Sequence, residues 1–176
     1  MFKKILIALA LVIVIFAVVA SLQSDEFRVM RSVTISASAA DIFAQLNNQH
    51  KWQSWSPWSK LDPNATFLFE GPEQSVGSIV KWSGNNELGE GTSTIVESRP
   101  DEFIRFKLDF VRPMEASNIA EFTFKAEGAQ TIVTWTMYGK KNFLSKAVGL
   151  LMNCEKMVGG QFEQGLASLK MIAEKK

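Results

Sequence analysis

The sequence has very little of the chemistry on which most metal sites and hydrolytic enzymes depend. Its 176 residues include one cysteine, Cys154, and one histidine, His50. A single cysteine excludes an intrachain disulfide and any cysteine-based metal cluster. With one imidazole and one thiol far apart in the sequence, the usual zinc ligands and catalytic triads lack their residues. We therefore expect no metal ion and no cofactor.

The chain also lacks an excess of positive charge. Its net charge is +1, from 19 basic and 18 acidic residues. Two of the basic residues, Lys3 and Lys4, precede a long apolar run, so the rest of the chain is slightly acidic. A nucleic-acid-binding domain normally has a basic excess, because phosphate contacts supply much of its affinity. We expect no nucleic-acid partner.

Apolar residues, by contrast, are abundant. Hydrophobic residues make up 47% of the chain, including 13 Phe and 5 Trp. This supply predicts a packed or ligand-lined interior rather than disorder. Residues 1–24 differ in kind from the rest, and residues 25–176 are enough for one globular domain.

The N-terminal segment has the layout of a signal anchor or a signal peptide. A short basic start is followed by Ile5 to Ala20, which contains no polar residue. As a helix, residues 5–22 would span about 27 Å, close to the roughly 30 Å of a bilayer's hydrocarbon core. We expect these residues to cross a membrane once, with the domain on the exported side, periplasmic or extracytoplasmic.

Cleavage of this segment is the alternative. Val18 and Ala20 are small enough for a signal-peptide cleavage site after Ala20. The product would be a secreted or periplasmic domain without an anchor.

Alternation of apolar and polar residues predicts strands over most of the domain. Phe27 to Ser36 has the pattern of a half-buried strand. Ser38, with Asp41 three residues later, predicts the start of a short helix. Beyond a tryptophan-rich loop, turn residues separate six more strand-like segments, residues 66–70, 76–83, 91–99, 102–111, 117–126 and 131–138. In the later segments polar residues alternate with apolar ones, which predicts that one face of the sheet is solvated and the other is covered.

The cover is predicted to be one long amphipathic helix. Apolar residues recur at three- and four-residue steps from Phe143 to Lys175, and Cys154 lies on their side as a small core thiol. Glycines weaken this helix and suggest a bend or a close backbone approach. We expect a kink near Gly159 and Gly160.

Several motifs, in this order, resemble members of the SRPBCC superfamily, which includes START and birch-pollen-allergen proteins, and in particular members labelled polyketide cyclase/dehydrase. They are Arg31-Ser32 with Ile35, Trp52-x-x-Trp55-Ser56-Pro57-Trp58, Gly77-Ser78 before Trp82-x-Gly84, Gly89-Glu90-Gly91, and Phe162-Glu163-x-Gly165-Leu166. The resemblance implies an α+β helix-grip fold, in which a curved antiparallel sheet of about seven strands wraps around a long C-terminal helix. It also implies an apolar cavity between them, but a fold alone does not settle function.

Bulky residues on the inward faces are the candidate wall of that cavity. We expect Trp82, Phe106, Phe110, Trp135 and Met157 to line it as a soft aromatic surface suited to lipophilic ligands. In a fully packed domain the same residues would be plain core.

The three tryptophans of the loop also have two interpretations. Trp52, Trp55 and Trp58 are three residues apart. They are predicted either to plug one end of the core, or to form the floor of a cavity mouth or a membrane contact.

Two ionisable residues are candidates for polar contacts. Arg31 shares parity with the inward residues Val29 and Val33, so it either binds a ligand carboxylate or pairs with an acidic residue at the sheet edge. Glu90 lies between two glycines, which can let a ligand approach its carboxylate for general acid or base catalysis. The alternative for Gly89-Glu90-Gly91 is a β-bulge or tight turn with an exposed Glu90.

The leading functional hypothesis is therefore a membrane-tethered domain that binds a hydrophobic small molecule or lipid. The alternatives are a cyclase- or hydrolase-type enzyme that uses Glu90 on a polyketide-like substrate, and a structural or interaction domain with a filled core. No convincing catalytic constellation is present, so the sequence favours binding over catalysis.

Overall fold

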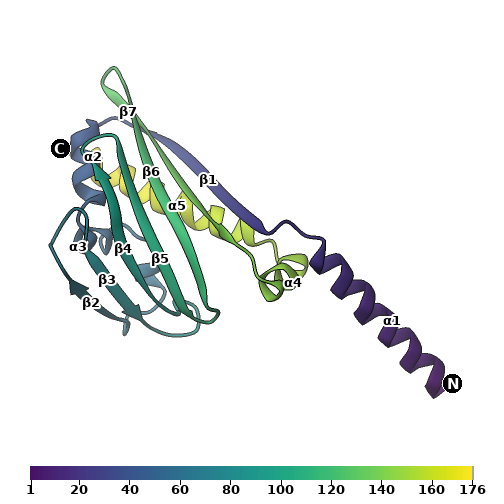
Figure 1. Ribbon diagram of the computed structural model, residues 1–176. Coiled ribbons are helices and arrows are strands. Elements are labelled where there is room, and N and C mark those ends of the chain that lie inside the picture. The colour runs from purple at the N-terminus through teal and green to yellow at the C-terminus, as the bar shows by residue number, and fades with distance from the viewer. Residues whose placement is uncertain (176) are drawn as a thin grey trace.

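One antiparallel sheet forms the frame of the structure, a computed structural model that describes residues 1–175. Residue 176, the last of the expected domain 25–176, lies outside the described residues. The seven strands are β1 (Glu26–Ile35), β2 (Thr66–Glu70), β3 (Ile79–Ser83), β4 (Glu90–Arg99), β5 (Phe103–Arg112), β6 (Ala116–Glu127) and β7 (Gln130–Lys140). Their order is β1-β7-β6-β5-β4-β3-β2, so β2 to β7 form a meander and β1 pairs with the last strand (Figure 1). The predicted strands are confirmed.

Helices lie on one face and at the ends of this sheet. They are α1 (Phe2–Ser21), α2 (Ala39–Leu46), α3 (Gln49–Trp52), the 3-10 helix η1 (Trp58–Lys60), α4 (Phe143–Leu151) and α5 (Cys154–Ala173). The side chain of Ser38 accepts a hydrogen bond from the Asp41 backbone N–H and caps α2, as its sequence predicts. Helix α5 runs across the sheet and covers its inner face (Figure 1).

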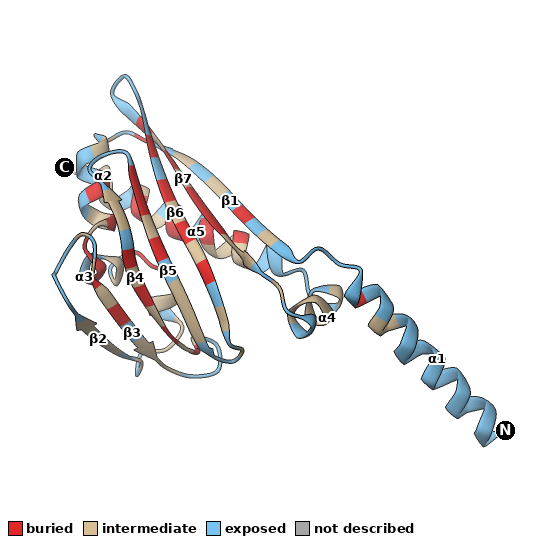
Figure 2. Ribbon diagram, in the orientation of Figure 1, coloured by how far each residue is buried: buried red, intermediate tan, exposed pale blue. Residues whose placement is uncertain are grey.

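The core lies between the sheet and α5 (Figure 2). The inward residues of β6 and β7 are almost wholly buried, and so is one side of α5 from Phe162 onward. Apolar side chains on these elements that are at most 2% exposed include Phe122, Val133, Trp135, Phe162, Leu166 and Leu169. Burial of such side chains contributes about 1.5–3 kcal/mol each, which makes this layer the main source of stability.

The predicted single C-terminal helix is wrong, because two helices occupy its place. Helix α4 ends at Leu151 and α5 begins at Cys154, where the side chain of Asn153 accepts a hydrogen bond from the Lys156 backbone N–H. Asparagine is a preferred N-cap residue, so a new helix starts there. Helix α5 continues through Gly159 and Gly160, so the kink expected there stays a prediction. Cys154, at the break, is exposed rather than a core thiol.

Two glycines of α5 allow neighbouring segments to approach the helix closely, which was the alternative explanation for the glycines in this helix. A Cβ atom on Gly159 would collide with the guanidinium of Arg31, which crosses the helix at that point. A Cβ atom on Gly165 would lie 2.9 Å from the Trp135 ring and 3.2 Å from Pro57. These glycines therefore let α5 approach β1, β7 and the tryptophan-rich loop.

Helix α1 extends away from the sheet (Figure 1). It has a mean hydropathy of 2.9 and is long and apolar enough to span a membrane. Ala20, near its C-terminal end, is the one buried residue of the helix. An apolar N-terminal helix is confirmed, and both an anchor and a signal sequence have this form.

Candidate ligand-binding cavity

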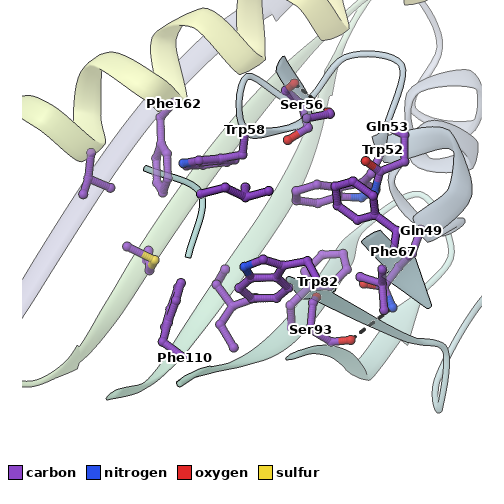
Figure 3. Close-up of a pocket in the computed structure, with 18 of the residues that line it drawn as sticks. Gln49, Trp52, Gln53, Ser56, Trp58, Phe67, Trp82, Ser93, Phe110 and Phe162 are labelled. Carbon is purple, nitrogen blue, oxygen red and sulfur yellow. Dashed lines mark hydrogen bonds between the residues drawn. The ribbon is translucent and has the colours of Figure 1, made fainter. Parts of the chain in front are cut away.

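A cavity of about 310 Å³ lies between the sheet, the α3 to η1 segment and α5 (Figure 3). This volume is at the lower end of the roughly 300–1,000 Å³ typical of ligand pockets. Its lining is mainly aromatic and aliphatic, and its largest side chains are Trp52, Trp58, Phe67, Trp82, Phe106, Phe110, Trp135 and Phe162. The cavity therefore offers an apolar ligand an extended hydrophobic surface.

Four of the five predicted wall residues line this cavity. They are Trp82, Phe106, Phe110 and Trp135, and their contact with a ligand stays a prediction. Met157 does not line it, because its side chain is 55% exposed on the outer side of α5. One step along a helix turns a side chain by about 100°, so the next residue, Val158, lies on the lining instead.

The Trp135 ring lies at the centre of the aromatic wall. It is parallel to the Phe162 ring, with centroids 4.0 Å apart, and edge-to-face with the rings of Trp52, Trp55 and Trp58 at centroid distances of 5.5–6.0 Å. Trp135 is only 2% exposed. This residue is therefore both core and cavity wall, so the two interpretations of the inward aromatics do not exclude each other.

The tryptophans of the loop have different positions, one in the core and two at the cavity. Trp55 is fully buried and belongs to the core. Trp52 and Trp58 line the cavity, and the Trp52 indole N–H donates to the Leu46 carbonyl at 3.0 Å. Because Pro57 begins the turn into η1, the chain carries Trp58 back over the cavity.

Gln49 supplies a polar group at the inner end of the cavity that no sequence pattern predicts. Gln49 is 2% exposed, and its amide nitrogen donates to the Ser78 carbonyl at 2.8 Å. It also lies 3.3 Å from the Ser93 carbonyl, to which it donates a second hydrogen bond (Figure 3). Among residues 1–175 no hydrogen bond ends on its amide oxygen, which leaves an acceptor beside an apolar space. No sequence pattern distinguishes this glutamine from the others.

Arg31 pairs with α5 and does not line the cavity. Its guanidinium donates to Glu163 at 2.6 Å and lies 2.9 Å from the carboxylate of Glu155. The hydrogen bonds to these two carboxylates raise the pKa of Arg31. Of its two predicted roles, ion pairing is confirmed, with partners on α5.

Glu90 also lies outside the cavity lining. Its carboxylate accepts a hydrogen bond from Arg112 at 3.0 Å, and both side chains are about half exposed, at 40% and 49%. The sheet register shifts between Glu90 and Gly91, so the predicted β-bulge is confirmed. A Cβ atom on Gly91 would collide with the Trp82 ring, which explains this glycine without catalysis. A role for Glu90 as an acid or base stays a prediction.

The cavity mouth carries the ionisable residues of the lining. They are Glu87 in the β3–β4 connection and Arg112 at the end of β5, both exposed. Leu88 and Pro113 lie beside them. In the described part of the chain no three His, Cys, Asp or Glu residues are grouped so that they could hold a metal ion.

A protein-family model matches residues 26–174 of the chain, and its description is polyketide cyclase / dehydrase and lipid transport. The chain belongs to this family. The predicted membership of the SRPBCC superfamily is thus confirmed. No curated protein sequence matches the chain.

Solved structures share the family's fold at low sequence identity. The di-domain ARO/CYC protein StfQ of the steffimycin pathway has a TM-score of 0.64 at 12% identity, over 85% of this chain and 51% of its own. The major latex-like protein 151 of Panax ginseng has a TM-score of 0.60 at 15% identity, over 86% and 99%. The Aha1 dimer of Colwellia psychrerythraea has a TM-score of 0.60 at 17% identity, over 85% and 97%. The predicted helix-grip fold is confirmed.

Proposed function

We propose that this chain is a membrane-tethered protein that binds a hydrophobic small molecule or lipid in its internal cavity. In this proposal residues 1–24 are the anchor, residues 25–176 are the binding domain, and the domain lies on the exported side of the membrane because Lys3 and Lys4 precede the span. The observation that carries the proposal is the apolar cavity of about 310 Å³ inside the fold.

The composition of the cavity supports a ligand that is apolar along most of its length. Trp82, Phe106 and Phe110 supply flat apolar surface, and the amide oxygen of Gln49 supplies an acceptor at the inner end. A hydroxyl or N–H group at one end of the ligand could donate a hydrogen bond to this acceptor. The family description, which includes lipid transport, agrees with this ligand class.

An enzymatic role has weaker support from the site. The family description also includes cyclase and dehydrase activity, which requires a positioned acid or base beside the substrate. The ionisable residues of the lining, Glu87 and Arg112, are exposed at the mouth. Glu90, the other candidate, is paired with Arg112 instead.

A cavity-filling substitution tests the binding proposal. Ala120 is 2% exposed and lines the cavity, so the larger side chain of Ala120→Leu should occupy ligand space. The matched control is Ala126→Leu, on the exposed end of the same strand β6. An environment-sensitive apolar dye, titrated into the chain without residues 1–24, should bind the native domain and the control. Its affinity for Ala120→Leu should fall by about tenfold or more. Equal affinities for all three would reject the cavity as the binding site.

A further inference from the structure

Helix α4 is an apolar helix that the domain does not bury. Six of its nine residues are apolar, yet none of its residues is buried and none belongs to the core. Four large side chains on and just after it, which we call the α4 patch, are between 47% and 77% exposed; they are Phe143, Leu144, Leu151 and Met152. A cluster of exposed large apolar side chains marks an interaction surface more often than a solvated one.

The position of α4 indicates which surface covers the patch. Helix α4 packs against the end of α1 that leads into the domain (Figure 1). The ammonium group of Lys146 pairs with the Asp25 carboxylate and lies 3.4 Å from the Ser21 carbonyl, while the Lys141 backbone N–H donates to the Asp25 carbonyl at 2.7 Å. If α1 crosses a bilayer, these contacts hold α4 at the level where the span meets water.

The residues next to the patch suit a lipid surface. Lys140 and Lys141 lie shortly before α4, whereas Lys146, within the helix, is held by Asp25 and does not face the surface. Apolar residues with lysines beside them are typical of helices that lie in the headgroup region, where the lysines face phosphates. A patch that binds a soluble protein would not need to lie beside the end of α1.

The cavity mouth lies at the same end of the sheet. Arg112, at the end of β5, pairs with Glu90 at the start of β4. The neighbouring strand β6 begins at this same end of the sheet and pairs there with the end of β7, which leads into α4. Val158, early in α5, belongs to the cavity lining. In Figure 1 the connections at this end of the sheet, α4 and the start of α5 all lie toward α1.

We propose that α4 is an interfacial helix, which lies in the surface of the bilayer that α1 crosses and turns the cavity mouth toward that bilayer. The ligand then passes between the lipid phase and the cavity without crossing bulk water. The loading step rests on the proposed binding function, whereas the contact of α4 with lipid rests only on the proposed membrane anchor.

Lipid contact can be measured on the full chain in vesicles of phosphatidylethanolamine and phosphatidylglycerol. In a Cys154→Ser background, a fluorescent label is placed on Leu144→Cys in the patch, on Val111→Cys beside the mouth, or on the exposed control Met171→Cys near the far end of α5. Lipids with quenchers near the headgroup and upper acyl chain should quench the label at 144 strongly and at 111 partly. The label at 171 should be unaffected.

Equal quenching at positions 144 and 171 would overturn the contact of α4 with lipid. Quenching at 144 without any at 111 would overturn the orientation of the mouth. If unlabelled Leu144→Cys forms disulfide-linked dimers and the labelled variant is not quenched by lipid, a second copy of the chain covers the patch. That result would also overturn the proposal.

Loading is measured separately, with a fluorescent fatty acid placed in the vesicle bilayer. The double variant Leu144→Glu with Leu151→Glu should take up this probe about tenfold more slowly than the native chain. Its affinity for the same probe added from water should be unchanged, and Met171→Glu should load like the native chain. An unchanged loading rate in the double variant would overturn the loading step. A native chain that binds the probe from neither source would refute the binding function, while the quenching result would still decide the role of α4.

Discussion

The rings of Trp135 on β7 and Phe162 on α5 are stacked, with their centroids 4.0 Å apart and their planes 5° from parallel. This stack joins the sheet to the helix that covers it, and Gly165, one turn further along α5, leaves room for the Trp135 ring. Both rings also line the cavity. The same contact thus holds the fold together and shapes the candidate binding site.

Trp135→Ala should therefore carry the penalty of a core substitution. The indole is 2% exposed and borders several other aromatic rings, so its loss should reduce the free energy of unfolding by about 3–5 kcal/mol. Denaturant unfolding of the chain without residues 1–24 measures this change. Met171→Ala, at a 60% exposed position, is the control and should change stability by less than about 0.5 kcal/mol. A penalty below about 1.5 kcal/mol for Trp135→Ala would mean that the ring is not part of a packed core.

Phe110→Ala should have the opposite balance of effects. Phe110 is partly exposed at the cavity and has an edge-to-face contact with Trp82 at a centroid distance of 5.7 Å. Because its ring already borders open space, we expect a loss of about 1–2 kcal/mol of stability together with weaker binding of an apolar dye. A stability loss as large as that of Trp135→Ala, with unchanged dye binding, would contradict its role as a cavity wall.

Removal of residues 1–24 should leave a folded domain that is soluble. Helix α1 has one buried residue, Ala20, and contributes none to the core cluster. Circular dichroism and sedimentation of the shortened chain measure its folding and solubility. An insoluble or unfolded product would show that the segment is part of the fold.

Glu90→Gln should have little effect on the domain. The carboxylate is 40% exposed and pairs with Arg112 on the surface, and exposed ion pairs contribute about 0–1 kcal/mol. We expect a change in stability within this range and no change in dye binding. If an activity is found for the chain, a hundredfold loss of turnover with folding retained would favour the enzyme alternative.

The contact between α4 and the linker after α1 should weaken in acid. A hydrogen bond from Lys146 lowers the pKa of Asp25, and the lysine's charge lowers it further. A carboxyl whose pKa is lowered in the folded state contributes stability above its unfolded pKa of about 3.9. That contribution is lost as the pH falls through the lowered folded value. In NMR titration the Asp25 pKa should rise in Lys146→Met, and an unchanged pKa would show that the pair does not form.

Periodic patterns made most of the fold predictable. Alternation in residues such as Ile104, Phe106 and Val133 depends only on the local chain, so strands and their buried faces followed from it. The long helix failed because apolar residues continue through Leu150 and Leu151 at helical spacing, although they cover a different surface. Only the cap at Asn153 signals the break, and a single asparagine is a weak signal within an apolar pattern.

The candidate site was less predictable, because it depends on contacts between distant segments. Trp82 and Phe110 could be assigned to the wall from strand parity. Gln49, on helix α3, could not, because its burial depends on pairing with Ser78 just before β3 and with Ser93 on β4. Met157 was assigned to the wall in place of its neighbour Val158, which lines the cavity. Apolar spacing alone does not show which of two adjacent apolar residues on a helix faces the interior, and the exposed Cys154 had been placed on the same side as Met157.

The central claim is that the cavity holds an apolar molecule, and native mass spectrometry of the chain purified from cells tests it most directly. The native chain should carry a bound lipid or other apolar compound, which organic extraction then releases for identification. Ala126→Leu should carry the same mass, and Ala120→Leu, with the cavity filled, should carry little or none. A folded native chain that holds no such molecule, and that binds none when apolar compounds are added, would contradict the account and indicate a structural domain.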